Sequence, residues 1–435
     1  MNVTLPAADN TPLPAGLPHV AVILLWYPLF TQPFIFREVE QLRRHLPLTV
    51  YSLYGQNQRC CSGEMRAAAG ATRTLGLRAL PRILRELAVQ IVTHPRRLGR
   101  LFRQALCYRW TSCEALCENI WAFLAGLYLA RRFREDGMDM IYAPWPRGTA
   151  TAARVAAKIA GIPYVLAVRG DNLDPADPDL ADKLREALFV RVNNAADKTR
   201  TEAFGKGEAR DKTHLVYNAL TLPGENTCPA RLQMPVRLLA LGRFDVTKGF
   251  DVLLRACDIL AQRGRQFTLT LAGGGGHLLG LGKEEKRLRA LCTQLGLENR
   301  VQFPGLVSHN ELPRLLVAHD IFVAPCVIHA SGRRDGIPNT VIEALSCGMP
   351  VVSSNIHALP EVVRNGETGL TVSPGDPEAL ADAIQWFMEH PAEARQMGEQ
   401  GQQLVRGMFD PEANSRALTE LFAANFPRRK PTCAA

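Results

Sequence analysis

The chain has 435 residues, 47% of them hydrophobic, which allows two domains with apolar cores and excludes a disordered protein. Its eleven cysteines are an odd number without CxxC spacing, and its start lacks a basic leader, so we expect a reduced, cytoplasmic chain. The net charge of +9 comes from one arginine-rich segment.

Strands and helices alternate through the first half of the chain. Short apolar or β-branched runs predict strands at 20–26, 49–54, 140–143, 164–168, 189–192 and 214–217. Helical periodicity predicts helices at 34–45, 78–107, 114–134, 149–160 and 196–204. This alternation predicts an α/β domain with a parallel sheet. The apolar run 120–130 is shorter than a membrane span, so we expect a buried or interfacial helix there.

The arginine-rich segment covers residues 66–134. It holds thirteen arginines and no lysine, but only three acidic residues. Apolar residues at helical spacing predict basic amphipathic helices suited to an anionic membrane surface, which would place the protein on the inner face of the plasma membrane. A solvated arginine-rich face is the alternative. The segment lacks an RNA-binding motif and aromatic residues at stacking spacing, so we expect no nucleic acid partner.

A second alternation follows residues 221–235, which are rich in proline, glycine and polar residues and indicate a linker. The predicted strands are 237–241, 267–271, 301–303, 321–324, 351–353 and 370–372, with helices between them. We therefore predict domains at 1–225 and 226–410, with a terminal segment, 411–435, that contains a helix. In doubly wound sheets, ligands bind at the carboxyl ends of the strands.

Residues 335–354 carry the most specific pattern, in the order turn, helix, turn and strand. Asn339 or Thr340 can cap the helix, and Gly348 suits the left-handed residue after its end. The free N–H groups at the helix start can bind phosphate oxygens. The carboxylates of Asp335 and Glu343, seven residues apart, can accept hydrogen bonds from hydroxyl groups. A sugar nucleotide offers both kinds of group.

This acid-x7-acid element, with Gly-Ile-Pro after its first acid and Gly-Met-Pro-Val-Val at its end, resembles the donor site of family-4 (group 1) retaining glycosyltransferases of the GT-B fold. The family usually has Glu where this chain has Asp335. The run Pro-Leu-Phe-Thr-Gln-Pro-Phe-Ile-Phe-Arg-Glu at 28–38 resembles a branch that makes exopolysaccharides of the colanic-acid type.

The resemblance implies two Rossmann-like domains that face a cleft, with the helix of 411–435 packing back on the first domain. It also implies transfer of a sugar, with retention of configuration, from a nucleotide diphosphate sugar to a glycan or lipid-linked acceptor in cell-surface polysaccharide biosynthesis. No metal or other cofactor is implied.

Four catalytic candidates follow from the resemblance: Asp335, Glu343, Arg243 and Lys248. Arg243 and Lys248 lie between a strand end and a helix start, where two cations can reach one diphosphate and stabilise the charge on the leaving nucleotide. Donor-binding candidates lie at strand ends and at the helix start: Gly242, Gly273, Gly274, Val307, Gly336, Ile337, Pro338 and Asn339.

Trp145, Arg169, Asp171 and Asn218 are the acceptor-side candidates. Many family members have histidines near the strand ends where this chain has Trp145 and Arg169. Asn218 resembles the first residue of the family's Asn-Gly, with Ala219 in place of the glycine. Glu38 lies either on the acceptor side or on an ordinary helix face. Two alternatives to this function are another GT-B class, such as a glucan synthase or phosphorylase, and an inactive regulatory or nucleic-acid-binding homologue.

Overall fold

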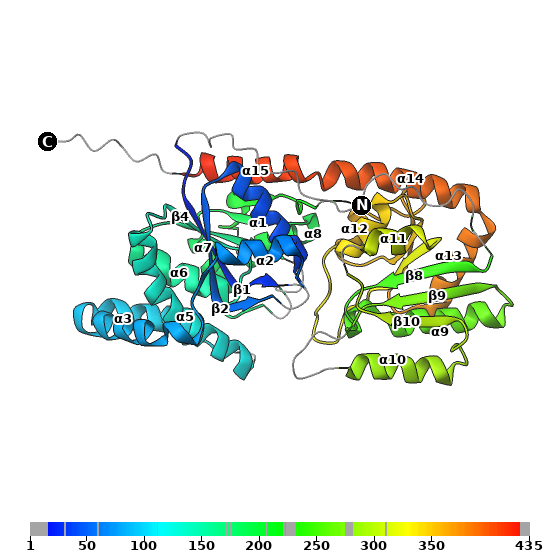
Figure 1. Ribbon diagram of the computed structural model, residues 1–435, viewed down its shortest axis with the longest axis horizontal. Coiled ribbons are helices and arrows are strands. Elements are labelled where there is room, and N and C mark those ends of the chain that lie inside the picture. Colours follow the sequence, from blue (N-terminus) through cyan, green and yellow to red (C-terminus); the bar gives the residue numbers. More distant parts are fainter. Residues whose placement is uncertain are drawn as a thin grey trace. The chain divides into compact units, whose positions relative to one another are not determined.

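The computed structural model describes residues 16–426, apart from 30–31, 59–60, 111, 170–172, 174–175, 206, 221, 223–231, 233, 275–281 and 309–310. These residues form two compact units (Figure 1). The N-terminal unit contains the described residues up to 220 together with 411–426. The C-terminal unit contains those from 222 to 410.

The N-terminal unit is built on a parallel sheet, with the order β3-β2-β1-β4-β5-β6-β7 among the described residues. Its strands are β1 (Val20–Leu29), β2 (Leu48–Asn57), β3 (Arg73–Thr74), β4 (Met140–Ala143), β5 (Tyr164–Val168), β6 (Val190–Val192) and β7 (Thr213–Leu215). The six predicted strands are therefore confirmed, with the last one shifted towards the N-terminus.

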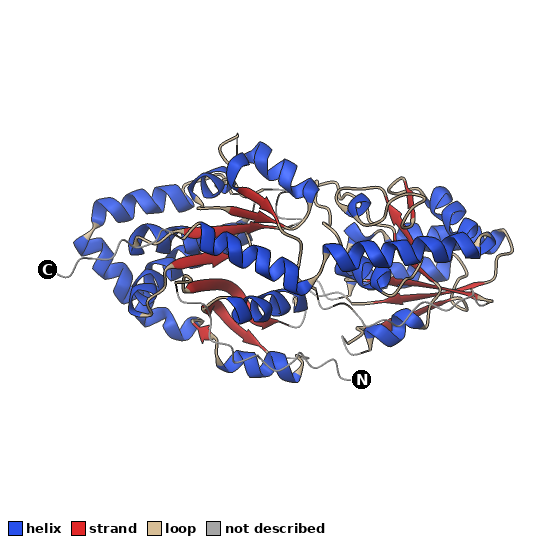
Figure 2. Cartoon of the chain, turned by 90° about the horizontal axis from the view of Figure 1, so that it is seen from above, coloured by secondary structure: helices blue, strands red, loops and turns tan. Residues whose placement is uncertain are grey.

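Helices cover the sheet of the N-terminal unit (Figure 2). They are α1 (Pro33–His45), α2 (Gly63–Gly70), α3 (Leu80–Thr93), α4 (Pro95–Leu106), α5 (Cys113–Glu135), α6 (Gly148–Ala160), α7 (Leu180–Glu186), α8 (Ala195–Phe204) and α15 (Pro411–Ala424). Alternate residues of β1 enter two cores, because side chains alternate across a strand. Ala21 and Ile23 pack with residues of α5 and α6, whereas Val20 and Val22 pack with residues of α1 and α15.

The predicted single helix at 78–107 is wrong, because the chain forms α3 and α4 with a break at His94. Pro95 is the cause: proline disfavours helical backbone in the residue before it and is well placed in a first helical turn. Helix α5 is also longer than its apolar run suggested. Among the described helices, it is the one with the length and composition to span a membrane, although half of its apolar window is buried within the unit.

The C-terminal unit has a second parallel sheet, with the order β10-β9-β8-β11-β12-β13 among the described residues. Its strands are β8 (Val236–Leu241), β9 (Phe267–Ala272), β10 (Val301–Gly305), β11 (Ile321–Ala324), β12 (Val351–Ser354) and β13 (Leu370–Val372), which confirms all six predicted strands. Its helices are α9 (Phe250–Gln262), α10 (Lys283–Gln294), α11 (Leu312–Val317), α12 (Asn339–Ser346), α13 (Pro377–Glu389) and α14 (Pro391–Met408).

The strand order reverses between β8 and β11. The chain runs from β8 outward through β9 and β10, and then crosses back to place β11 on the other side of β8. Connections at such a reversal leave in opposite directions and open a crevice at the carboxyl ends of the two strands. The C-terminal unit therefore offers one preferred ligand position by its topology alone.

Candidate functional site

The crevice at the reversal is lined by the ends of β8 and β11 and by the start of α12. A small cavity of about 10 Å³ lies there, and Lys248, Pro338 and Thr340 contribute to its wall. The Thr340 hydroxyl donates a hydrogen bond of 3.2 Å to the carbonyl oxygen of Leu241, the last residue of β8. This contact fixes the start of α12 against the strand end.

Lys248 and Asp335 meet at this crevice. The Lys248 Nζ lies 3.2 Å from the Asp335 Oδ2, and both side chains are mostly buried. Burial alone would lower the pKa of Lys248, but the Asp335 carboxylate outweighs it, and the net pKa is raised. Lys248 is therefore a fixed cation at neutral pH. The structure brings together two residues that the sequence placed in one site.

Two glycines allow the backbone around Lys248 to pack closely. Gly249, which follows Lys248, has a φ of +63°, and a Cβ there would lie 1.9 Å from the Pro325 carbonyl oxygen at the end of β11. A Cβ on Gly273 would lie 1.8 Å from the Gly242 carbonyl oxygen. Neither position tolerates a side chain, so the loops after β8 and β9 can approach a ligand through their backbones.

We expect Gly249→Ala to destabilise the C-terminal unit by at least about 3 kcal/mol, because it combines backbone strain with a clash against backbone. Gly264→Ala is the matched control, since its φ is +71° but no atom lies within 4 Å of an added Cβ. That change should cost only about 1–2 kcal/mol. Urea unfolding followed by circular dichroism measures both, and equal losses would show that the contact with Pro325 has no effect.

Asp245 supports this loop and was not predicted from the sequence. Its carboxylate accepts hydrogen bonds from the backbone N–H and the hydroxyl of Thr247, at 3.0 and 2.9 Å. It also pairs with Arg333 at 2.9 Å. Burial raises the pKa of Asp245, but the hydrogen bonds from Thr247 and the charge of Arg333 lower it by more. The sequence does contain a signal for this contact, because an Asp two residues before a Thr often binds the backbone N–H of that Thr in a turn.

Helix α12 begins differently from the prediction. Pro338 occupies the N-cap position and no side chain caps the helix, so the proposed caps at Asn339 and Thr340 are wrong. Thr340 bonds to β8 instead. The first N–H groups of α12 are thus left without a side-chain cap at the crevice. At the other end, Gly348 has a φ of +73°, as predicted.

The remaining donor-side candidates differ in their exposure. Glu343 is buried within α12. Arg243 is exposed, yet it lies close enough for its charge to oppose protonation of Lys248. Six further candidates are half-buried: Gly274, Val307, Gly336, Ile337, Pro338 and Asn339. Within the part of the chain that the structure describes, no group of three or more His, Cys, Asp or Glu residues is arranged to hold a metal ion.

In the N-terminal unit, Arg169 and Asn218 belong to a buried ionic network centred on Glu38. The Glu38 carboxylate accepts two hydrogen bonds of 2.7 Å from Arg169 and one of 2.6 Å from Arg191. Tyr142 donates to it at 3.0 Å. Burial raises the pKa of Glu38, but the two arginines lower it to about 2. Sequence analysis missed Arg191, which lies in an apolar strand.

These contacts give Glu38 a structural role in the N-terminal unit, because it binds Arg169, Arg191 and Tyr142. Asn218 accepts a hydrogen bond of 3.0 Å from Arg169, whose guanidinium also lies 6.0 Å from the centre of the Trp145 ring. A contact between Arg169 and a substrate therefore stays a prediction. Asp171 lies outside the described residues.

Comparison with known proteins assigns part of the chain to a family. Residues 230–404 match the family described as glycosyl transferases group 1. The chain carries a group 1 glycosyltransferase domain. The match contains Arg243, Lys248, Asp335 and Glu343, so the resemblance seen in the sequence is confirmed for the domain that holds the candidate site.

Named relatives match part of this chain. WcaL of Salmonella typhimurium, named for colanic acid biosynthesis, is 31% identical over 177 residues, which cover 41% of this chain and 40% of that protein. The amylovoran biosynthesis glycosyltransferase AmsK of Erwinia amylovora is 35% identical over 150 residues, or 34% of this chain and 35% of that protein. The chain thus matches less than half the length of these relatives.

Solved structures extend the likeness of the fold beyond the group 1 domain. Anabaena HepE in complex with UDP has a TM-score of 0.68 at 18% identity, and the match covers 94% of this chain and 100% of that one. A sucrose-phosphate synthase from Thermosynechococcus elongatus has a TM-score of 0.66 at 20% identity, covering 94% and 99%. These matches confirm the predicted GT-B fold.

Proposed function

We propose that this protein is a retaining glycosyltransferase. It moves a sugar from a nucleotide diphosphate sugar to a glycan or lipid-linked saccharide in cell-surface polysaccharide biosynthesis. The observation that carries the proposal is the Lys248–Asp335 pair in the crevice beside α12. The names of WcaL and AmsK support the pathway class, and the UDP in the HepE structure supports the donor class.

The candidate site contains groups suited to both the diphosphate and the sugar of such a donor. Lys248, Arg243 and the start of α12 supply positive charge for the diphosphate, so no metal ion is assigned to this role. Asp335 and Glu343 supply acceptors for the hydroxyl groups of the sugar. The short Lys248–Asp335 contact holds the cation in place before the donor arrives, and this limits the reorganisation needed on binding.

The reaction follows from this arrangement. The bond between the anomeric carbon and the β-phosphate oxygen breaks, and the acceptor hydroxyl oxygen bonds to the same face of that carbon. The hydroxyl proton passes to the departing phosphate. Lys248 and Arg243 stabilise the negative charge that develops on this phosphate. Fixed cations at this position lower the activation free energy of the bond cleavage.

A panel of nucleotide sugars tests the function. We expect the protein to release a nucleoside diphosphate from at least one of them, with or without acceptor, and to do so in the presence of EDTA. Nuclear magnetic resonance of the product should show the anomeric configuration of the donor. Inversion of the anomeric carbon would contradict the retaining assignment, and no release from any donor would favour an inactive homologue.

We also propose that α3 and α4 attach the protein to an anionic membrane surface. Arg96, Arg100 and Arg103 of α4 are exposed, and so is the apolar side chain of Phe102 between them. Basic residues near an anionic surface contribute about 1 kcal/mol each, and salt screens them. Such attachment would place the protein on the cytoplasmic side of the plasma membrane, where lipid-linked acceptors are accessible.

Liposome co-sedimentation measures this attachment. We expect binding to rise with anionic lipid, to fall with salt, and to weaken at least about tenfold when Arg96, Arg100 and Arg103 become glutamine. The matched control replaces three exposed arginines of the C-terminal unit, Arg289, Arg364 and Arg395. Binding that ignores lipid charge would instead identify α4 as a solvated basic face.

A further inference from the structure

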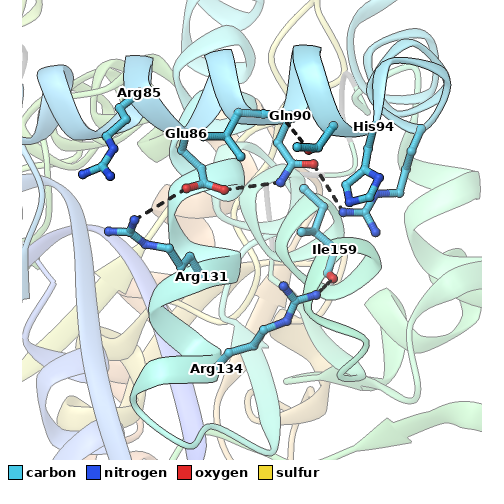
Figure 3. Close-up of a pocket in the computed structure, with 10 residues that line it drawn as sticks. Arg85, Glu86, Gln90, His94, Arg131, Arg134 and Ile159 are labelled. Atoms are coloured by element: carbon cyan, nitrogen blue, oxygen red, sulfur yellow. Dashed lines mark hydrogen bonds and ion pairs between the residues drawn. The ribbon is translucent and has the colours of Figure 1, made fainter.

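A pocket of about 420 Å³ lies in the N-terminal unit, beside the ends of α5 and α6 (Figure 3). It is lined by residues of α3, α4, α5 and the end of α6. Four arginines line it: Arg85, Arg97, Arg131 and Arg134. Figure 3 shows Glu86 and Gln90 pointing from α3 towards Arg131 and Arg134 of α5. This volume is typical of sites for small ligands.

The charges of the pocket are unbalanced. Glu86 is the one carboxylate in its described lining, and its Oε2 lies 3.9 Å from Arg131 Nη1. Arg97 donates from Nη2 to Gln90 at 3.3 Å, but its buried Nε has no hydrogen-bond partner among the described residues. A buried donor without a partner is costly, so the pocket lacks an acceptor. An anion would supply one.

Helix α3 buries Ile83 in the core, but it also buries polar residues and leaves a second apolar face exposed. Its polar residues Glu86 and Gln90 are only 7% and 6% exposed, whereas its apolar residues Ile91 and Val92 are 52% and 79% exposed. A soluble unit normally buries the apolar stripe of such a helix. Val89 lines the pocket and is also exposed, so the pocket and the apolar face meet there. A ligand with an anionic group in the pocket and an apolar chain on the exposed face of α3 would pair the arginines and cover the apolar side chains.

We propose that this pocket binds the phosphate group of an anionic lipid, with the hydrocarbon chain of the lipid along the exposed face of α3. Guanidinium groups bind phosphate oxygens through paired hydrogen bonds, so several arginines around one cavity select phosphate over a diffuse surface charge. This proposal goes beyond the proposed function, because binding of a lipid phosphate in the pocket does not depend on which sugar the protein transfers. The pocket recognises one head group, whereas α4 responds only to surface charge.

Two double variants of the full chain separate recognition from general attraction. Arg85→Gln with Arg97→Gln removes one pocket arginine from α3 and one from α4. Arg82→Gln with Arg109→Gln removes the same charge from the same arginine-rich segment, at exposed positions outside the pocket lining. Binding is measured on phosphatidylcholine vesicles that contain phosphatidic acid or phosphatidylserine, at matched surface charge. Thermal unfolding checks that both variants fold.

We expect the wild type to prefer phosphatidic acid, whose phosphate is terminal and accessible. The pocket variant should lose about tenfold in affinity for these vesicles and lose the preference, whereas the control variant keeps the preference. Equal losses in both variants would overturn the proposal in favour of general attraction. Inorganic pyrophosphate tests the other source of phosphate by calorimetry: if it binds the pocket while the vesicles show no preference, the ligand is soluble and the lipid assignment is wrong.

Discussion

Replacing Glu343 by glutamine will lower sugar transfer by about two to three orders of magnitude while the chain keeps its fold. The change keeps the shape of a buried side chain in α12 and removes its negative charge. In our account, the negative charge of Glu343 stabilises the positive charge that develops on the donor sugar in the transition state. A neutral amide does not provide this stabilisation. The rate of nucleoside diphosphate release, at saturating donor, is the measurement.

The matched control is Glu298→Gln, which removes the same charge from an exposed position in the same unit. It should leave the rate within about twofold, since isolated exposed charges have little effect on a distant site. A Glu343→Gln protein with full activity and a much lower melting temperature would show that Glu343 maintains the fold and takes no part in transfer.

Replacing Glu38 by glutamine should destabilise the N-terminal unit by about 3–5 kcal/mol, because it leaves buried charges without their partner. Arg169 and Arg191 both pair with this carboxylate, and all three side chains are buried. Urea unfolding measures the loss. Glu40→Gln on the same helix is the control, and its partly exposed side chain should contribute at most about 1 kcal/mol.

The pH dependence of this difference has a fixed sign. The pKa of Glu38 is lowered from 4.5 to about 2, so its contribution to stability is fully present above pH 4.5 and is lost as the pH falls through about 2. The stability difference between the wild type and Glu38→Gln should be constant at neutral pH and should shrink only in that acidic window. A difference that disappears near pH 6 would assign the effect to another group.

The sheets of both units could be predicted because strands buried on two faces are continuous apolar runs. Val351 and Val352, or Ile321 and Phe322, need no long-range information to be recognised. The sequence placed Lys248 and Asp335 in one site through the resemblance, but it did not predict their ion pair. That pair forms because the strands before the two residues lie next to each other in the sheet.

The predictions that were wrong or missing depended on tertiary contacts, which a sequence pattern does not reveal. The cap of α12 was misplaced because Thr340 uses its hydroxyl on β8, a tertiary bond that overrides the local preference for capping. Arg191 was overlooked because its partner, Glu38, lies on a distant helix. The orientation of α3 was not predictable either, because periodicity identifies an apolar face but not the surface that it meets.

The most direct test of the donor site compares ligands that differ only in the diphosphate. We expect Lys248→Ala and Arg243→Ala each to weaken binding of UDP or GDP, whichever the protein prefers, by about tenfold or more, and to leave the corresponding nucleoside within about twofold. Lys286→Ala, at an exposed position of the same unit, should change neither. Equal weakening of nucleoside and nucleoside diphosphate would contradict the account, because these cations would then not hold the diphosphate.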